Sequence, residues 1–194
     1  MHADTRLSRL LDLLARRSAR RGQFTLASGK QSTLYIDARL TTMSPEGLTL
    51  IGPLALGALL DAGWDVQSVG GLTLGADPIS YAISYASADA ASRGEQQAPL
   101  RAFTVRKEAK AHGTGKLVEG TFEPGDRVAV IEDVITTGGS ALKAIAALRA
   151  AGGTVAGVLA LVDREEGGRE AIEQEANVPV VALTRASEIV ERME

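Results

Sequence analysis

Two adjacent carboxylates and a glycine-rich segment give the strongest indication of chemistry in this sequence. Glu132 and Asp133 follow the apolar run 128–131, and residues 136–140 (Thr-Thr-Gly-Gly-Ser) lead into a helical pattern from Ala141. Glycine N–H groups, threonine hydroxyls and the positive end of a helix dipole suit a phosphate monoester. The carboxylates can accept hydrogen bonds from vicinal sugar hydroxyls or from hydrated Mg²⁺. Residues 128–140 therefore predict a ribose 5-phosphate site, the alternative being a strand end with a plain helix-capping turn.

A second segment is rich in cations. Within eleven residues the chain carries Arg106, Lys107, Lys110, His112 and Lys116. Glu108 offsets one charge, and Gly113 and Gly115 permit a change of backbone conformation. A closing loop of this kind can bring cations to a diphosphate leaving group and exclude water, whereas the alternative is a solvated charged loop. His112 is interpreted as a hydrogen-bond donor to phosphate in preference to a general acid.

An arginine follows another apolar run. Asp163 and Arg164 come directly after residues 158–162 (Val-Leu-Ala-Leu-Val). Arginine is the side chain best shaped for bidentate recognition of a carboxylate. If residues 158–162 form a strand parallel to 128–131, Arg164 and Asp133 meet at the same edge of the sheet. Without further support, the favoured interpretation is an ordinary surface Asp-Arg pair.

Several classes of protein are excluded or disfavoured. The chain has no cysteine and two histidines, which excludes disulfides, thiolate nucleophiles, Cys-ligated metals and a multi-histidine metal site. Its formal net charge of −3 disfavours nucleic-acid coating. The Gly113–Lys116 segment is followed by Leu117 and not by Ser or Thr, so it is no Walker A loop. No Gly-x-Gly-x-x-Gly follows a predicted strand, which disfavours a binding site for a nicotinamide dinucleotide. No apolar run reaches the roughly 20 residues of a membrane span, and we expect a soluble intracellular protein.

The elements that must position these residues can be read from the periodicity of apolar side chains. Leucines from Leu7 to Leu14 predict a helix, and residues 24–36 predict a β-hairpin with a turn at 28–30. Ser44 and Pro45 predict a helix start, with the helix running to about Leu60. The remaining predicted elements are strands at 66–69, 101–105, 128–131, 155–162 and 178–183, helices at 76–86 and 141–150, and an exposed loop at 87–99. This alternation predicts a doubly wound α/β domain with a mainly parallel sheet.

The motifs resemble those of a known family. Residues 132–140 resemble the phosphoribosyl diphosphate (PRPP) motif of type I phosphoribosyltransferases, and the chain is similar to the orotate phosphoribosyltransferases over nearly its whole length. Segments 24–37 and 70–78 resemble that family's N-terminal segment and its pyrophosphate-side loop, and Arg106–Gly113 (Arg-Lys-Glu-Ala-Lys-Ala-His-Gly) resembles its catalytic loop. Ala27 and Thr73-Leu74 depart from the Lys and the Tyr-Lys pair of some members.

The resemblance implies transfer of the 5-phosphoribosyl group from PRPP to orotate, giving orotidine 5′-monophosphate and diphosphate with Mg²⁺. Catalytic residues would be Lys107, Lys110, His112 and Asp133. The PRPP site would comprise Arg106, Lys107, Lys110, His112, Glu132, Asp133, Val134, Ile135, Thr136, Thr137, Gly138, Gly139 and Ser140. Orotate would contact Thr136 and Arg164, with Ser28, Lys30 and Tyr35 shaping the pocket. Mg²⁺ would be held mainly by substrate and water, with no protein metal site.

The resemblance also implies a cytoplasmic homodimer with shared active sites, in which Lys107 of one subunit reaches the diphosphate bound to the other. Residues 1–194 would form one domain, and residues 1–40 part of a helix-hairpin hood over the site. Two alternatives stay open: a phosphoribosyltransferase for a purine base, and a PRPP-sensing regulator without turnover. A neutral base needs no arginine clamp, and a regulator usually adds a basic nucleic-acid surface, so Arg164 and the net charge of −3 disfavour them.

Overall fold

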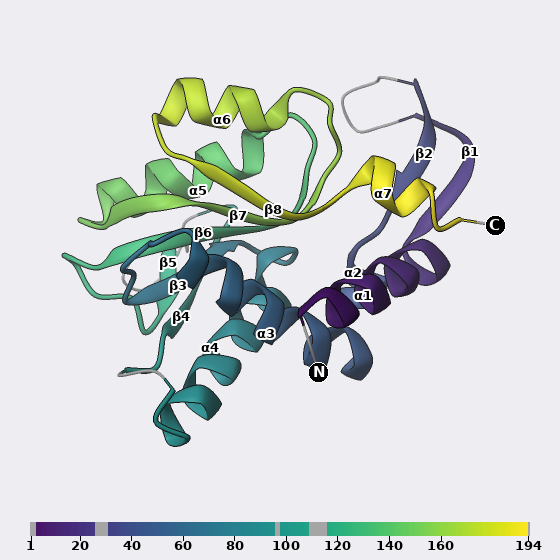
Figure 1. Cartoon of the computed structure of the whole chain (residues 1–194). Coiled ribbons are helices and arrows are strands. Elements are labelled where there is room, and N and C mark those ends of the chain that lie inside the picture. Colours follow the sequence, from purple (N-terminus) through teal and green to yellow (C-terminus); the bar gives the residue numbers. More distant parts are fainter. Residues whose placement is uncertain (1–2, 26–30, 96–97, 109–115, 194) are drawn as a thin grey trace.

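The computed structural model describes residues 3–25, 31–95, 98–108 and 116–193. Its main element is a six-stranded sheet in the order β5-β4-β3-β6-β7-β8 (Figure 1). The strands are β3 (Ser68–Leu72), β4 (Arg101–Val105), β5 (Val118–Gly120), β6 (Arg127–Ile135), β7 (Thr154–Asp163) and β8 (Val180–Arg185). All neighbouring strands are parallel except β4 and β5, which are antiparallel.

Helices cover both faces of this sheet (Figure 1). On β6, Ala129 and Ile131 pack into the hydrophobic cluster that contains helices α3 (Pro45–Asp61) and α4 (Ala76–Ser92). The alternate residues Val128 and Val130 pack into the cluster of α5 (Gly139–Ala150) and α6 (Gly168–Ala176). Both faces of a central strand are buried, which explains its continuous apolar sequence. The doubly wound, mainly parallel α/β fold predicted from the sequence is confirmed.

The N-terminal elements lie beside one end of the sheet, next to the C-terminal helix (Figure 1). They are α1 (Ala3–Arg17), β1 (Ala19–Thr25), β2 (Gln31–Ile36) and α2 (Arg39–Thr42), with α7 (Ala186–Val190) nearby. The hairpin predicted at 24–36 is confirmed as the antiparallel pair β1–β2, which begins at Ala19, and its predicted turn lies outside the described residues. Leu10, Leu13 and Leu14 of α1 are buried in the same cluster as α3 and α4. The division into a hood at 1–40 and one overall domain stays a prediction.

Several element boundaries differ from the prediction. Gly70 and Gly71 belong to β3 instead of following it. Glycine is required at both positions, because a side chain at Gly70 would meet Phe103 and one at Gly71 would meet the Ile131 carbonyl. Helix α4 continues to Ser92, so residues 87–92 are no loop. Ser87 is buried there, where its hydroxyl donates to the Ser84 carbonyl (2.7 Å) and accepts from the Leu100 N–H (2.8 Å). Small buried residues made this helix end look like an exposed loop.

Four of the described elements were not predicted: the edge strand β5, helix α6 and the short helices α2 and α7. β5 has three residues and pairs only with β4, so its sequence shows no apolar run. In α6 the one large buried apolar side chain is Ile172, which is too few for a visible helical period. No helix in the described ranges is long and apolar enough to cross a membrane.

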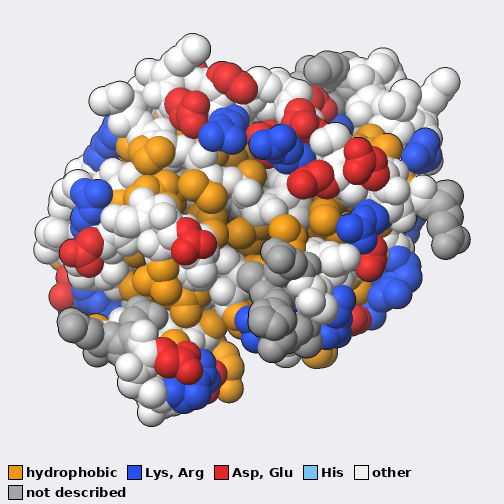
Figure 2. Space-filling view, in the orientation of Figure 1, with side chains coloured by type: hydrophobic (Ala, Val, Ile, Leu, Met, Phe, Trp, Pro, Cys, Tyr) orange, Lys and Arg blue, Asp and Glu red, His pale blue; other side chains and the backbone are white. Residues whose placement is uncertain are grey.

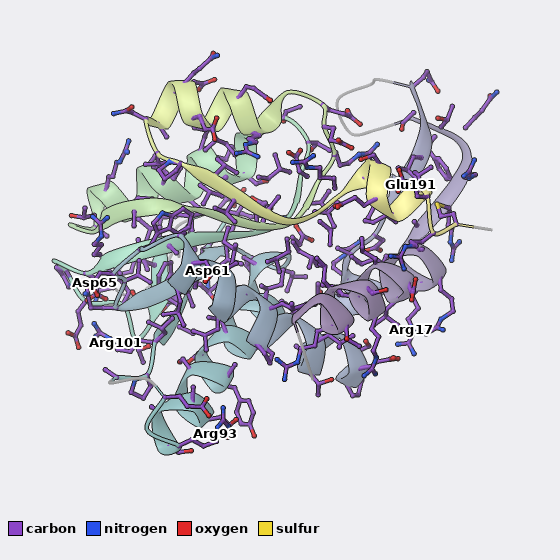
Figure 3. All side chains as sticks on the ribbon, in the orientation of Figure 1. Arg17, Asp61, Asp65, Arg93, Arg101 and Glu191 are labelled. Atoms are coloured by element: carbon purple, nitrogen blue, oxygen red, sulfur yellow. The ribbon has the colours of Figure 1, made fainter. Side chains whose placement is uncertain are left out.

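A buried polar cluster joins the strands at the N-terminal edge of the sheet. Asp126 is 6% exposed and accepts hydrogen bonds from Arg101 (2.5 Å) and from the Ser68 hydroxyl (3.0 Å). Arg101, which is labelled in Figure 3, also pairs with Glu123 at 2.7 Å. These contacts tie the starts of β3, β4 and β6 together, so the strands are fixed at the edge opposite to the candidate site.

Candidate active site

A cleft of about 290 Å³ opens at the C-terminal edge of the sheet, between β3 and β6. Counting parallel strands in chain order, the sheet runs 2-1-3-4-5, so the connections from β3 and β6 leave in opposite directions. Ligands of open α/β sheets bind at this type of switch point. The cleft is lined by residues 35–39 from the end of β2 to the start of α2, residues 72–75 from the end of β3 to the residue before α4, Lys107, residues 132–134 of β6, and Ser140 of α5.

The predicted carboxylate pair lies in this cleft. Glu132 is 7% exposed, and its Oε2 atom has no hydrogen-bond partner among the described residues. Burial, and then the neighbouring Asp133 carboxylate, raises the pKa of Glu132 well above its ordinary value. Asp133 is half-buried, and its Oδ1 accepts a hydrogen bond from the Val134 N–H at 2.9 Å. The pair offers acceptor oxygens to a ligand, and one of them is buried and unused.

The predicted phosphate loop begins helix α5. Gly138 is the N-cap residue with φ 81° and ψ −7°, a conformation that favours glycine, and it contributes no capping side chain. A helix N-terminus without a capping side chain leaves N–H donors for an anion. Thr137, Gly139 and Ser140 are exposed, and Thr136 is half-buried. The loop is therefore accessible, and its role in binding phosphate stays a prediction.

The packing behind the loop was not predicted. A side chain at Gly138 would lie 2.8 Å from both the Gly168 carbonyl oxygen and Ile172 Cγ1, and one at Gly168 would meet the Thr136 carbonyl. The start of α6 thus rests directly on the loop. Ile135 is 1% exposed and lies in the core, so only its backbone is near the site.

Of the two predicted cations of segment 106–108, one lines the cleft and one does not. Lys107 is exposed and lines the cleft of its own chain. Arg106 does not line it; its guanidinium pairs with Glu119 at 4.0 Å and donates to the Glu108 carbonyl at 3.3 Å. Lys110 and His112 lie outside the described residues, as do Ser28 and Lys30.

Sequence reasoning missed a further arginine. Arg39 lines the cleft and binds Asp37 through Nε at 2.8 Å and through NH2 at 3.0 Å. This hydrogen-bonded guanidinium lowers the pKa of Asp37 below its ordinary value. The signal was present in the sequence, because the Tyr35–Asp37 motif was recognised and Arg39 follows it by two residues. Tyr35, predicted to shape the pocket, lines the cleft.

Arg164 lies apart from the lining of this cleft, against the hairpin. Its NH2 group donates to the Ser32 hydroxyl and to the Leu34 carbonyl, both at 3.1 Å, and pairs with Glu166 at 2.8 Å. Arg164 is 8% exposed, and its Nε has no partner among the described residues. Its backbone N–H donates to the Ile135 carbonyl at 3.0 Å, which places it beside Thr136. Arg164 therefore joins the end of β7 to strand β2 and keeps one buried donor unused.

Comparisons with known proteins agree with this geometry, although no family model matches the sequence. The chain is 46% identical over 185 residues to the orotate phosphoribosyltransferase of Aquifex aeolicus, covering 95% of this chain and 96% of that protein. A crystal structure of Mycobacterium tuberculosis orotate phosphoribosyltransferase with Fe(III) dicitrate has a TM-score of 0.80 and 40% identity, covering 95% and 98% of the two chains.

A second structure of the M. tuberculosis protein, in complex with PRPP, matches with a TM-score of 0.74 and 34% identity, covering 95% and 92% of the chains. High identity over nearly the full length of both partners, together with the same fold, is decisive for membership. The chain belongs to the orotate phosphoribosyltransferase family.

Proposed function

We propose that this protein transfers the 5-phosphoribosyl group of PRPP to orotate, forming orotidine 5′-monophosphate and diphosphate in pyrimidine nucleotide synthesis. The observation that carries the proposal is the cleft at the switch point. It brings together an acidic pair, the start of α5 and a lysine. A sugar phosphate with a diphosphate leaving group requires hydroxyl acceptors, phosphate donors and a cation, and the cleft offers all three.

In this mechanism the carboxylates act on the ribose. Asp133 and Glu132 accept hydrogen bonds from the ribose hydroxyls, one of which donates to the otherwise unpartnered Oε2 of Glu132. Departure of diphosphate leaves positive charge at C1 of the ribose. Nearby carboxylates stabilise that charge more in the transition state than in the ground state, and this difference accelerates the reaction. Orotate N1 then attacks C1, so no protein nucleophile is needed.

The two phosphate ends of PRPP lie on different elements. Thr137, Gly138, Gly139 and Ser140 bind the 5-phosphate through backbone N–H groups and hydroxyls at the start of α5. Lys107 binds the diphosphate in its own subunit's cleft, and Arg106, Lys110 and His112 of the cationic segment 106–116 add further cations, with Arg106 acting in the partner's site. Arg39 adds a cation that the resemblance did not supply, since it lines the cleft beside Lys107.

Mg²⁺ fits the residues of the cleft as a cofactor bound mainly through substrate. No group of three or more His, Cys, Asp or Glu side chains that could hold a metal by themselves occurs in the described ranges. Glu132 and Asp133 supply hard oxygen acceptors, one of them unpartnered, which suit the water shell that Mg²⁺ retains. Bound Mg²⁺ would supply positive charge to the diphosphate.

Orotate is the acceptor that best suits Arg164. The residue is a buried arginine with an unused Nε donor next to the phosphate loop, and orotate carries a carboxylate. Thr136 adjoins it. A purine base offers no carboxylate to this guanidinium, and a PRPP-sensing regulator would require no acceptor site.

We also propose that the protein is located in the cytoplasm and forms a homodimer. The absence of cysteine is compatible with the reducing conditions of the cytoplasm. The support for the homodimer is an apolar groove of about 1020 Å³ between α3 and α4. Leu60, Tyr81 and Tyr85 line it and are 60%, 54% and 78% exposed. Figure 2 shows hydrophobic side chains gathered over this part of the surface. Such a surface is typical of one covered by a second copy.

The reaction itself is tested by mixing the protein with PRPP, Mg²⁺ and orotate and following the loss of orotate absorbance. We expect turnover with orotate and none with adenine or hypoxanthine. Turnover with a purine base alone would support the purine enzyme, and PRPP binding without turnover on any base would support the regulator.

The Glu132→Gln variant separates stability from activity. Because its folded pKa is raised, the carboxyl of Glu132 favours the protonated form, and its ionisation destabilises the folded state as pH rises above the ordinary value of 4.5. Glutamine cannot ionise, so the variant should gain stability relative to wild type as the pH rises above 4.5, by about 1.4 kcal/mol per unit of pKa elevation. Chemical unfolding across this range measures the gain, and kcat should fall. Parallel stability curves for the two proteins would contradict the assignment.

The Arg164→Ala variant tests acceptor recognition. Loss of a charge-assisted contact of about 1.5–3 kcal/mol should raise KM for orotate roughly ten- to a hundred-fold and leave KM for PRPP nearly unchanged. Since Arg164 also holds strand β2, Ser32→Ala is the matched control, because it removes one of those contacts and keeps the guanidinium. An equal loss for both substrates, or a Ser32→Ala variant that behaves like Arg164→Ala, would show a structural role only.

Mixed dimers test whether active sites are shared. The resemblance implies that Lys107 reaches the diphosphate of the other subunit. Because Lys107 lines the cleft of its own chain, we propose instead that it serves its own site, so that inactive Lys107→Ala and Asp133→Asn chains should not complement each other after subunit exchange. Arg106 points elsewhere, toward Glu119, and can serve the partner. Arg106→Ala mixed with Asp133→Asn should therefore recover about a quarter of wild-type activity, because about half the dimers are mixed and each has one intact site. Mass spectrometry checks the exchange. Recovery by the Lys107 pair would instead put Lys107 in the partner's site, and failure of both pairs would argue against sharing.

A further inference from the structure

Asp77, in the first turn of α4, binds two threonines from two other elements. Its Oδ2 accepts a hydrogen bond from the Thr73 hydroxyl at 2.6 Å, and its Oδ1 accepts one from the Thr104 hydroxyl at 2.9 Å. An acidic residue in the first helical turn is favoured by the helix dipole. The dipole does not account for two threonine partners outside the helix, one on each carboxylate oxygen.

The first partner belongs to the loop that lines the cleft. Thr73, Leu74 and Gly75 form part of the cleft wall. Gly75 packs against the ribose-binding carboxylate so closely that a side chain there would lie 2.5 Å from Asp133 Cγ. A movement of this loop would therefore reach Asp133 directly.

The second partner belongs to the strand that leads to the cations. Thr104 lies in β4, two residues before Arg106 and three before Lys107. The Val105 carbonyl also accepts the Thr73 backbone N–H at 2.9 Å. Beyond Thr104, the Tyr81 hydroxyl lies 3.1 Å from its Oγ1, and Tyr81 lines the α3–α4 groove. Asp77 thus connects the loop on Asp133 with the base of the segment that carries Lys107.

We propose that Asp77 is a positioning residue for PRPP, which fixes the spacing between the Thr73–Gly75 loop and the end of β4. The inference rests on the proposed function. It also gives a role to Thr73, whose hydroxyl is used by Asp77, so the loop meets the diphosphate side of the cleft through its backbone. A small displacement of groups around a reacting centre can lower the rate up to a hundred-fold.

The test compares four variants in steady-state kinetics, calorimetric PRPP binding and thermal unfolding. In Asp77→Ala we expect kcat/KM for PRPP to fall at least tenfold and PRPP affinity to weaken, with KM for orotate within twofold of wild type. Asp77→Asn should restore most of this loss, since its amide oxygen accepts from one threonine and its NH2 group donates to the other. Thr104→Val, which keeps the shape and removes one hydroxyl, should give a partial loss even if Asp77→Ala folds poorly.

Asp61→Ala is the matched control, because it removes an exposed acid from the far end of α3 and should behave as wild type (Figure 3). A lower melting temperature with unchanged PRPP parameters, or an equal loss for orotate and PRPP, would overturn the positioning role and leave a structural one. The same holds if Thr104→Val matches wild type. A wild-type protein without turnover on orotate would instead contradict the proposed function, and PRPP calorimetry would still test Asp77.

Discussion

The site depends on where two neighbouring strands stop pairing. β3 and β6 pair from Ser68↔Val128 to Gly70↔Val130 and no further. β3 continues with β4 to Leu72↔Val105, while β6 continues with β7 to Ile135↔Asp163. Two strands that separate while still held by their outer neighbours open a wedge, and the cleft occupies it. Glycines permit the close approach, since a side chain at Gly71 would meet the Ile131 carbonyl. This separation positions the described cleft residues that follow β3 and those at the end of β6.

The fold could be predicted from the sequence where burial leaves a pattern. β6 and β7 are buried on both faces, so their apolar runs were visible, and Ser44 caps α3 as its residue type suggested. β5 and α6 bury too little apolar surface to leave a pattern, and α4 ends on small buried residues. The predicted strand ends at Val69, before Gly70 and Gly71, because the reason for these glycines is their packing against Phe103 and Ile131, a contact between distant segments that the local sequence does not show.

The same distinction holds for the site. Glu132, Asp133 and residues 136–140 are contiguous, so local chemistry identified them. The contribution of Arg39 depends on residues 35–39 lying against β6, and that of Asp77 on β3 and β4 being adjacent. The packing of Gly168 on the phosphate loop is likewise tertiary. Arg164 was identified by its position after β7, yet its contacts with β2 could not be predicted, because they depend on how the hairpin sits over the sheet.

The charges of the cleft explain how a chain of net charge −3 can bind a polyanion. Positive charge is supplied locally by Lys107 and Arg39, and Arg39 is held by Asp37. Burial raises the pKa of Glu132 and favours its neutral form, which lessens its repulsion with the neighbouring Asp133 carboxylate. A ligand that brings hydroxyl donors and a cation reverses this balance and favours the ionised pair. The buried Glu132 therefore destabilises the free protein. A bound ligand that carries a cation or hydroxyl donors offsets this destabilisation, and such strained groups are common at functional sites.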